Sequence, residues 1–229
     1  MSVDSTLTFD FEAGEILNID KPAGITSFGV VHRIRKWTHC KKVGHGGTLD
    51  PMATGVLLIF TGKATKQVPQ FMDLSKVYEG TIELGKTTDT DDVEGQLIET
   101  RPVPEYDENR LRSVLESFLG EIEQVPPMFS ALKKDGQRLY KLARKGQVVH
   151  REPRKVTVHS IELLSCQWPS FRVRIACSKG TYIRAIARDI GHLVGTGGIL
   201  TALQRTQVGP YHVDEAYSLE AFEQMMKHT

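Results

Sequence analysis

The sequence predicts an α+β fold, because its strands and helices mix without the regular alternation that a doubly wound sheet requires. Two observations carry this prediction. Several short apolar or alternating segments end at Gly and Pro turn signals, as strands do, and a few longer segments repeat apolar residues at helical spacing. The chain of 229 residues, 40% of them hydrophobic and 25% charged, is long enough to bury a full core.

The first half of the chain is expected to contain four strands and one helix. A Lys-Pro-Ala-Gly turn signal ends the first strand. Ser27 is expected to cap the helix, whose apolar side consists of Val30, Val31 and Ile34. The predicted elements are a strand over 14–19, a helix over 27–37, strands over 55–60 and 77–84, and a strand over 97–100 that pairs with the one before it.

The second half is expected to contain three longer helices and three strands. The clearest helix covers 107–119, where apolar residues recur at helical spacing and Gly120 provides a stop. A helix over 181–194 directs four apolar residues to a core, namely Ile183, Ile186, Ile190 and Leu193. The remaining elements are strands over 156–163, 171–177 and 200–208 and a terminal helix capped by Ser218.

Charge is distributed unevenly, although the formal net charge is only +1. Residues 21–49 contain six basic and no acidic residues, and residues 133–155 contain nine basic residues against Asp135 and Glu152. Basic segments on an otherwise acidic chain are typical of a surface that follows a phosphate backbone, although two solvated faces would look the same. The segment 124–152, which contains the second basic run up to Glu152, is expected to pack weakly and to project outward.

Composition also bears on location. The three cysteines fit no CxxC spacing and are typical of reduced thiols in a cytosolic protein. The sequence has no apolar run of about 18 residues, and residues 1–15 are acidic without any basic residue, unlike a secretory signal. We therefore expect a cytoplasmic protein without a membrane segment.

Asp50 is the main candidate for chemistry. It follows a Gly-rich stretch and precedes a proline, so we expect it on an exposed loop of fixed conformation. Such a loop can present a carboxylate to a closely approaching substrate, whereas a turn aspartate bound to its own backbone is the ordinary alternative. The loop lacks the known phosphate-binding patterns, and neither His45 with Cys40 nor the acidic residues over 89–94 have the ligand spacing of a metal site.

Several motifs together resemble the bacterial family of tRNA pseudouridine(55) synthases, which act on uridine 55 in the T loop of tRNA. They follow the family's order from about Gly14 to Gly209. They are Leu17-Asn18-Ile19-Asp20-Lys21-Pro22, Gly24-Ile25-Thr26-Ser27, Val43-Gly44-His45 through Gly55-Val56-Leu57, Tyr78-Glu79-Gly80, Thr88-Asp89-Thr90-Asp91-Asp92, Pro126-Pro127-Met128-Phe129-Ser130-Ala131-Leu132-Lys133, Gly180-Thr181-Tyr182-Ile183-Arg184 and Ala202-Leu203-Gln204-Arg205-Thr206.

The resemblance implies a fold and a reaction. The fold is a central mixed, mostly antiparallel sheet flanked by helices, with an inserted basic thumb, here at about 124–152. The reaction breaks the N1–C1′ bond of a flipped uridine and rejoins the base through C5, with an ionised carboxylate as nucleophile or as base. Asp50 matches the family's catalytic aspartate, Arg184 its active-site arginine and Tyr78 the tyrosine that stacks on the uracil.

The resemblance also implies which residues bind the substrate. Arg184 is expected to keep Asp50 ionised, with Asp92 as the second partner of that arginine. The others are expected to surround the uridine or the T loop: Leu203 on the other side of the uracil, Tyr182 beneath Asp50, His45 in the place that the flipped base leaves, Lys21 in the wall of the site and Lys133 in the thumb.

Three features depart from the family pattern. Gln204 stands where the family usually has a basic residue, which we expect to remove one phosphate contact. Gly46 stands where the family usually has Thr or Ser, which we expect to loosen the catalytic loop. The sequence ends at Thr229. We therefore expect a short form, with a single catalytic domain over 1–229 and without the small C-terminal RNA-binding (PUA) domain of many members.

The sequence thus predicts an isomerase of this family that acts on tRNA as a monomer, without cofactor, metal or protein partner. Three alternatives remain: a tRNA-binding or tRNA-folding module without catalysis, a pseudouridine synthase that acts on another RNA, and a glycosidase. The joint presence of Asp50, Tyr78 and Arg184 disfavours the first, and the thumb-like insertion disfavours the second. A glycosidase would need a second carboxylate at a suitable separation.

Overall fold

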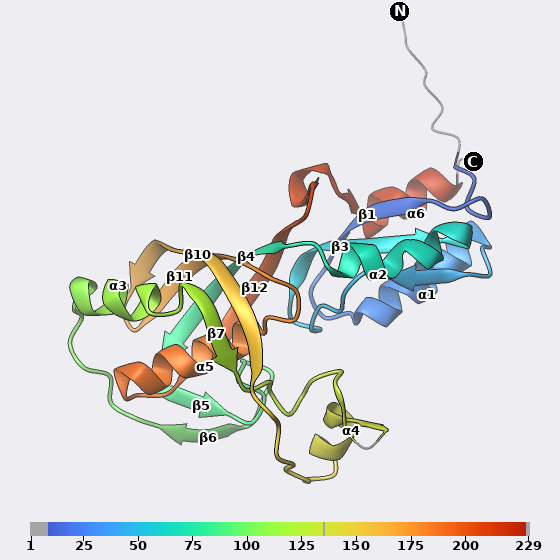
Figure 1. Cartoon of the computed structure of the whole chain (residues 1–229). Helices are drawn as coiled ribbons and strands as arrows, with labels where there is room; N and C mark the ends of the chain where they lie inside the picture. The colour runs from blue at the N-terminus through green and yellow to red at the C-terminus, as the bar shows by residue number, and fades with distance from the viewer. Residues whose placement is uncertain (1–8, 135, 228–229) are drawn as a thin grey trace, which may run out of the picture. The chain divides into compact units, whose positions relative to one another are not determined.

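The computed structural model describes residues 9–134 and 136–227 and divides the chain into two compact units (Figure 1). Unit 1 comprises the chain up to Leu74 and from Arg205 onward, and unit 2 comprises Ser75–Gln204. Residues 1–8 of the expected acidic lead-in, and Asp135 in the second basic run, lie outside the described residues. The expectation of a single catalytic domain stays a prediction.

Unit 1 contains one part of a ten-stranded sheet, and this part is mostly antiparallel. Strand β3 lies between β1 and the end of β12, β2 also pairs with β3, and β14 runs parallel to β1. The strands of this part are β1 (Ile16–Lys21), β2 (Val43–His45), β3 (Thr54–Thr61), β12 (Gly198–Val208), β13 (Tyr211–His212) and β14 (Tyr217–Ser218). Strand β12 begins in unit 2 and ends in unit 1.

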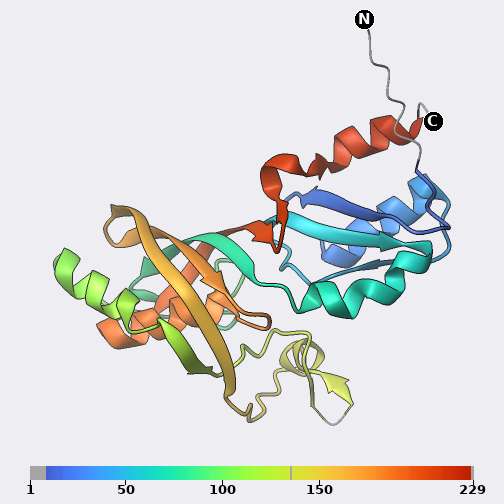
Figure 2. The same cartoon turned by 45° about the horizontal axis from the view of Figure 1, so that its top comes forward.

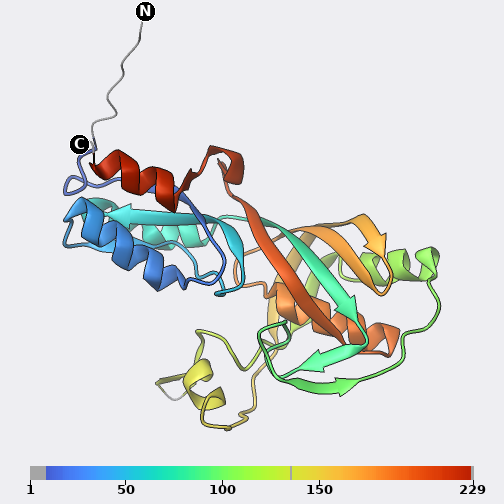
Figure 3. The ribbon, with the colours of Figure 1, turned by 180° about the vertical axis from the view of Figure 1, so that it is seen from behind.

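Helices cover both faces of this part of the sheet. Successive side chains of β3 point to opposite faces, and Val56, Leu58 and Phe60 form a core cluster with residues of η1 (Gly62–Gln67) and α2 (Val68–Met72). Helices α1 (Ser27–Thr38) and α6 (Leu219–Lys227) contact each other and cover the other face. Helix α2 is in front of β3 in Figure 1 and α1 is in front in Figure 3, which shows the molecule from behind.

The start of α1 differs from the prediction in one respect. Thr26, not Ser27, is the N-cap: its hydroxyl accepts a hydrogen bond from the backbone N–H of Gly29 at 3.0 Å. Ser27 is the first residue of the helix, is buried, and its hydroxyl contacts a distant loop instead. The predicted apolar side of the helix is confirmed, since Val30, Val31 and Ile34 are buried.

The part of this ten-stranded sheet that lies in unit 2 has the order β12-β4-β11-β10-β7, and its β4–β11, β11–β10 and β10–β7 pairs are antiparallel. Helices α3 and α5 contact each other, and α3 also contacts β10 while α5 contacts β4, so both helices lie on the same face of the sheet. These elements are β4 (Lys76–Leu84), α3 (Glu108–Glu116), β7 (Gly120–Gln124), β10 (Arg154–Gln167), β11 (Ser170–Cys177) and α5 (Ile183–Val194). The predicted α+β class and the mixed, mostly antiparallel pairing are confirmed.

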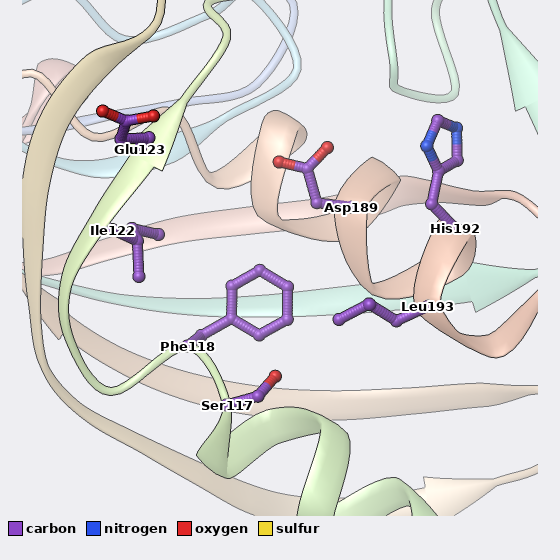
Figure 4. A pocket seen from close by; sticks show the side chains of 7 residues that line it. All are labelled: Ser117, Phe118, Ile122, Glu123, Asp189, His192 and Leu193. Atoms are coloured by element: carbon purple, nitrogen blue, oxygen red, sulfur yellow. The ribbon is translucent and has the colours of Figure 1, made fainter.

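Two element-level predictions for unit 2 are wrong. Strand β6 (Leu97–Thr100) pairs with β5 (Lys86–Thr88) and not with β4, because the chain leaves β4 at Gly85, whose φ is +89°. Leu193 was expected in the core but is 57% exposed, and its side chain extends from α5 toward Phe118 in a surface hollow (Figure 4). Among the described residues, no helix is both long and apolar enough to cross a membrane.

The basic insertion has a buried root and an exposed outer part. It contains β8 (Lys133–Lys134), β9 (Gln137–Arg138) and α4 (Leu139–Ala143), and Figures 1 and 2 show α4 away from the sheet of unit 2. Most residues from 124 to 130 are buried, so the expected weak packing is wrong for this part. We call residues 124–130 the thumb root and residues 131–152 the outer thumb, whose main buried residue is Leu139.

Candidate active site

The backbone on both sides of Asp50 is held in place within unit 1. The hydroxyl of Ser27 accepts from the N–H of Leu49 at 2.8 Å and donates to its carbonyl at 3.1 Å. On the other side, the Pro51 carbonyl accepts from the N–H of Gly24 at 2.9 Å. Asp50 itself is half-buried, and its carbonyl closes a turn with the N–H of Ala53. The loop therefore presents the Asp50 side chain from a fixed backbone.

Lys21 is fully buried and supports the same loop. Its ammonium group donates to the carbonyls of Pro22 at 2.8 Å, Ile25 at 2.7 Å and Pro51 at 3.2 Å. These carbonyls belong to the turn before α1 and to the residue after Asp50, so one buried charge joins the two segments. The expected place of Lys21 in the wall of the site agrees with this geometry, and any contact with substrate stays a prediction.

Arg205, which the sequence did not single out as functional, holds the glycine side of the loop. It is 2% exposed, and its guanidinium donates to the carbonyls of Val56 at 2.7 Å and Gly47 at 3.2 Å. Gly47 has a φ of +127°, which few residues other than glycine adopt. A buried arginine thus fixes the conformation of the loop three residues before Asp50.

Gly46 does not leave an empty space in the loop. Its N–H donates to the carbonyl of Leu58 at 2.9 Å, and a Cβ added at this position would lie 2.8 Å from the ring of Phe60. The fully buried Phe60 ring therefore occupies the place that a larger residue at 46 would need. We had expected Gly46 to loosen the loop, and instead this packing and hydrogen bond give the position its own support.

His45 is half-buried at the end of β2, beside the loop. Burial lowers the pKa of its imidazole, and the charge of Arg205 lowers it further, while a hydrogen bond with the backbone of Gly47 opposes both effects. His45 is therefore neutral near pH 7, and its predicted place beside the RNA would use stacking and hydrogen bonds rather than charge.

The lowered pKa of His45 predicts a pH-dependent stability. Because the folded state disfavours the imidazolium, stability should be complete above the ordinary histidine pKa of 6.5 and should fall as the pH drops through the folded pKa. The His45→Asn variant should lose less stability than the wild type between pH 7 and pH 5. Urea unfolding at a series of pH values measures this difference, with the exposed His32→Asn as control. Equal pH dependence in the wild type and His45→Asn would contradict it.

Arg184 lies at the start of α5 in unit 2 and is 3% exposed. It donates to the carbonyl of Thr90 at 2.7 Å and to that of Phe129 at 2.9 Å, and its Nε lies 3.5 Å from a carboxylate oxygen of Asp92. The predicted contact between Arg184 and Asp92 is therefore present. A guanidinium with these three partners has a fixed orientation.

In the acidic run after β5, the carboxylates of Asp89, Asp91 and Asp92 have protein partners. Asp92 accepts hydrogen bonds from the hydroxyl of Thr90 and, at 3.0 Å, from the N–H of Glu94. Asp89 accepts from the N–H of Gln96 at 2.7 Å. This part of the chain is a turn that is closed by its own side chains and that directs Asp92 at Arg184.

Tyr78 and Leu203 lie in adjacent strands of unit 2 and are both 9% exposed. Gly80, two residues after Tyr78 on the same face of β4, would place a Cβ 3.5 Å from a methyl group of Leu203, so the absence of a side chain there leaves room beside that leucine. Tyr182 precedes α5, and its backbone N–H and carbonyl both bind the buried amide of Gln124. Lys133 lies exposed in the outer thumb.

Each unit thus supplies part of the predicted set. Unit 1 holds the loop with Lys21, His45 and Asp50, and unit 2 holds Tyr78, Asp92, Tyr182, Arg184 and Leu203. Sequence reasoning missed three supporting residues, which are Ser27, Gln124 and Arg205. Ser27 and Arg205 lie in motifs quoted above, but the hydrogen bonds of all these residues join segments far apart in the chain, which a local pattern does not encode.

A separate hollow of about 300 Å³ lies between α5 and the α3–β7 connection in unit 2 (Figure 4). The ring of Phe118 points toward α5, with Leu193 beside it, and Glu123, Asp189 and His192 supply polar groups. None of the predicted site residues lines this hollow.

Solved structures and sequence relatives agree on the kind of protein. A chain of the Cbf5-Nop10-Gar1 complex superposes with a TM-score of 0.74 at 31% identity, covering 93% of this chain and 54% of that one. The fold is that of a pseudouridine synthase. The chain spans only about half of that solved chain.

Family models place the chain more narrowly. Residues 35–183 match the TruB family pseudouridylate synthase N-terminal domain, and residues 184–229 match the tRNA pseudouridylate synthase B C-terminal domain. The tRNA pseudouridine synthase B of Aromatoleum aromaticum is 51% identical over 91% of this chain and 67% of its own length. That of Opitutus terrae is 47% identical over 93% of this chain and 88% of its own. The chain belongs to the TruB family of pseudouridylate synthases and is an isomerase.

Proposed function

We propose that this enzyme converts uridine 55 of the tRNA T loop to pseudouridine, with Asp50 as the attacking carboxylate. The observation that carries the proposal is the fixed backbone of the Asp50 loop, which Ser27, Lys21 and Gly24 hold from both sides. The 51% identity to a tRNA pseudouridine synthase B supports tRNA as the substrate. The sequence identity to the Cbf5 chain is lower, at 31%, so this comparison gives less support for a substrate like that of Cbf5.

In the proposed reaction, ionised Asp50 either attacks C1′ or removes a proton from the sugar to begin a glycal route. The N1–C1′ bond breaks, the uracil turns, and a C5–C1′ bond forms while C5 loses its proton and N1 gains one. Tyr78 stacks on the uracil and Leu203 bounds its other side, with stacking worth about 1–3 kcal/mol. Arg184 supplies the positive charge that favours the ionised carboxylate.

Extraction of the uridine from the T loop costs a few kcal/mol, which other contacts with the RNA must offset. We propose that His45 takes the place of the flipped base, that Tyr182 supports the site, and that Lys133 with the rest of the outer thumb contacts the phosphates. The enzyme then works in the cytoplasm as a monomer, without metal, cofactor or protein partner.

The test is tritium release from C5-labelled uridine in unmodified tRNA. The expected result is release of one tritium per tRNA, with none from a transcript in which uridine 55 is replaced by cytidine. Release from the replaced transcript would move the target to another position. No release from either transcript, with tRNA binding intact, would favour a binding module without catalysis.

The exposed basic residues of the outer thumb are expected to make a salt-dependent contribution to tRNA binding. Changing Lys133, Arg138 and Lys141 to Gln should weaken binding and should reduce the slope of log Kd against log salt by about one for each lost phosphate contact. All three are exposed, so the fold should persist. Filter binding at several salt concentrations measures the slope, with Lys227→Gln on α6 as a matched control. A slope equal to that of the wild type would remove the thumb from the RNA interface.

A further inference from the structure

Helix α5 carries a second arginine, Arg188, one turn after Arg184. Residues four apart on a helix lie on the same side, so both guanidinium groups leave α5 in the same direction. Arg184 donates to the carbonyl of Thr90 and to that of Phe129 in the thumb root. We call residues 88–94, which include Thr90, the acidic turn.

Arg188 repeats this pattern one turn further along. It donates to a carboxylate oxygen of Asp91 in the acidic turn at 3.1 Å and to the carbonyl of Val125 in the thumb root at 3.0 Å. Its Nε also contacts Asp189 at 2.9 Å. The two arginines therefore connect the same two segments to α5, and each bonds both of them.

The backbone conformation of Asp91 allows the acidic turn to contact both arginines. Its φ of +61° is left-handed, which is uncommon for a residue other than glycine and is best tolerated by Asp and Asn. The backbone of Asp91 accepts from the N–H of Leu200 at 3.1 Å, which keeps the turn against β12. In this conformation two successive carboxylates separate, and Asp91 contacts Arg188 while Asp92 contacts Arg184.

We propose that Arg188 is a positioning residue for catalysis: through Asp91 and Val125 it holds the acidic turn and the thumb root against α5, and thereby keeps Arg184 in its active orientation. This inference rests on the proposed function, in which Arg184 acts on the uridine site. Arg184 takes its orientation from Thr90, Asp92 and Phe129. Each of those segments is also bonded by Arg188, so a shift of either segment moves the partners of Arg184.

The charges around Asp91 agree with a network that depends on Arg188. Burial raises the pKa of the Asp91 carboxyl, and the charges of Arg188 and Arg184 oppose that effect. Of the two arginines, Arg188 therefore contributes more to keeping the Asp91 carboxyl ionised. Loss of Arg188 would leave a buried acid beside the turn that presents Asp92.

The test compares Arg188→Gln, Asp91→Asn and the double variant, with Arg112→Gln as control. Arg112 lies in the same unit and forms an exposed ion pair with Glu108. We expect Arg188→Gln and Asp91→Asn each to lower the single-turnover rate of tritium release about 10- to 100-fold, with tRNA Kd within about twofold of the wild type. The double variant should lose no more than the worse single variant, since both break one connection.

A conservative variant distinguishes positioning from folding. Arg188→Lys keeps the charge beside Asp91 and should recover part of the rate, whereas a merely structural defect would lower the melting temperature and the rate together. Wild-type rates in Arg188→Gln would overturn the proposal. So would a raised Kd with an unchanged single-turnover rate, because Arg188 would then contact RNA directly. If Arg188→Gln does not fold, Asp91→Asn and Arg188→Lys decide by the same criteria.

Hydrogen exchange separates this inference from the proposed function. In Arg188→Gln, the amides of the thumb root and of the acidic turn should exchange faster than in the wild type, while Arg112→Gln leaves them unchanged. Wild-type enzyme that releases no tritium from the T loop would refute the proposed function, and the exchange rates would still decide the coupling. Unchanged exchange in both segments would refute the coupling.

Discussion

Asn in place of Asp50 is expected to abolish product formation while tRNA still binds. Asn keeps the size of the side chain but cannot act as a nucleophile or as a base, so we expect a loss of at least about 10⁴-fold in single-turnover rate. The fold should persist, because the loop is held by backbone contacts with Ser27, Gly24 and Lys21 rather than through the carboxylate alone.

The measurement is tritium release under single-turnover conditions, with tRNA Kd from filter binding. Asp73→Asn, an exposed carboxylate in the same unit, is the control and should retain the wild-type rate. A rate for Asp50→Asn within about tenfold of the wild type would exclude Asp50 as the catalytic carboxylate. A large loss of binding as well would show that Asp50 mainly shapes the loop.

The Asp50 loop shows how far a sequence can predict a site. The Gly-rich stretch and the following proline predict an exposed loop of fixed conformation. The structure has a loop whose backbone is held on both sides, but Asp50 is half-buried and Leu49 is buried. What fixes the loop was not predictable from local pattern, because Ser27 reaches Leu49 across 22 positions and Arg205 reaches Gly47 across 158. Ser27 was expected as a helix cap on the same grounds that make Thr26 the cap, since both are hydroxyl residues before an apolar periodic segment.

The fold was predictable in its elements and less so in its pairings. Periodicity located α5 and most strands to within a few residues, because burial of one face leaves a regular pattern. It could not assign a partner to the strand at 97–100, which depends on the turn at Gly85. Nor could it show that Leu193 is exposed, since an apolar residue at helical spacing is more often buried.

Of the predicted contacts, the pair of Asp92 with Arg184 was found where the resemblance placed it, at 3.5 Å. Its setting was not predictable, because Arg184 also bonds carbonyls of the acidic turn and of the thumb root. The sequence predicts an isolated pair of Asp92 and Arg184, whereas in the structure this pair is part of a network that includes Arg188 and Asp91. Because Arg184 belongs to this larger network, its removal should lower the free energy of unfolding more than the loss of a single ion pair would.

Arg184→Gln is expected to reduce both stability and activity strongly. The variant leaves the buried carboxylate of Asp92 without its charged partner and removes donors from two carbonyls. Breaking a buried ion pair by removing one partner typically costs about 3–5 kcal/mol. Arg174→Gln is the matched control: that arginine pairs with Glu79 and Glu162 but is 47% exposed, so its loss should lower the free energy of unfolding much less than the loss of Arg184. Urea unfolding compares the two variants.

A second substitution separates the structural from the catalytic part of the Arg184 effect. In the double variant Arg184→Gln with Asp92→Asn, the carboxylate that lost the Arg184 charge is also replaced by a neutral amide, so part of the lost stability should return. Activity should not return, because the positive charge that we propose Arg184 supplies at the uridine site is still absent, and the single-turnover rate should stay at least about 10³-fold below the wild type. If the double variant regained near wild-type turnover, Arg184 would serve only to neutralise Asp92, and the ionised state of Asp50 would depend on another cation.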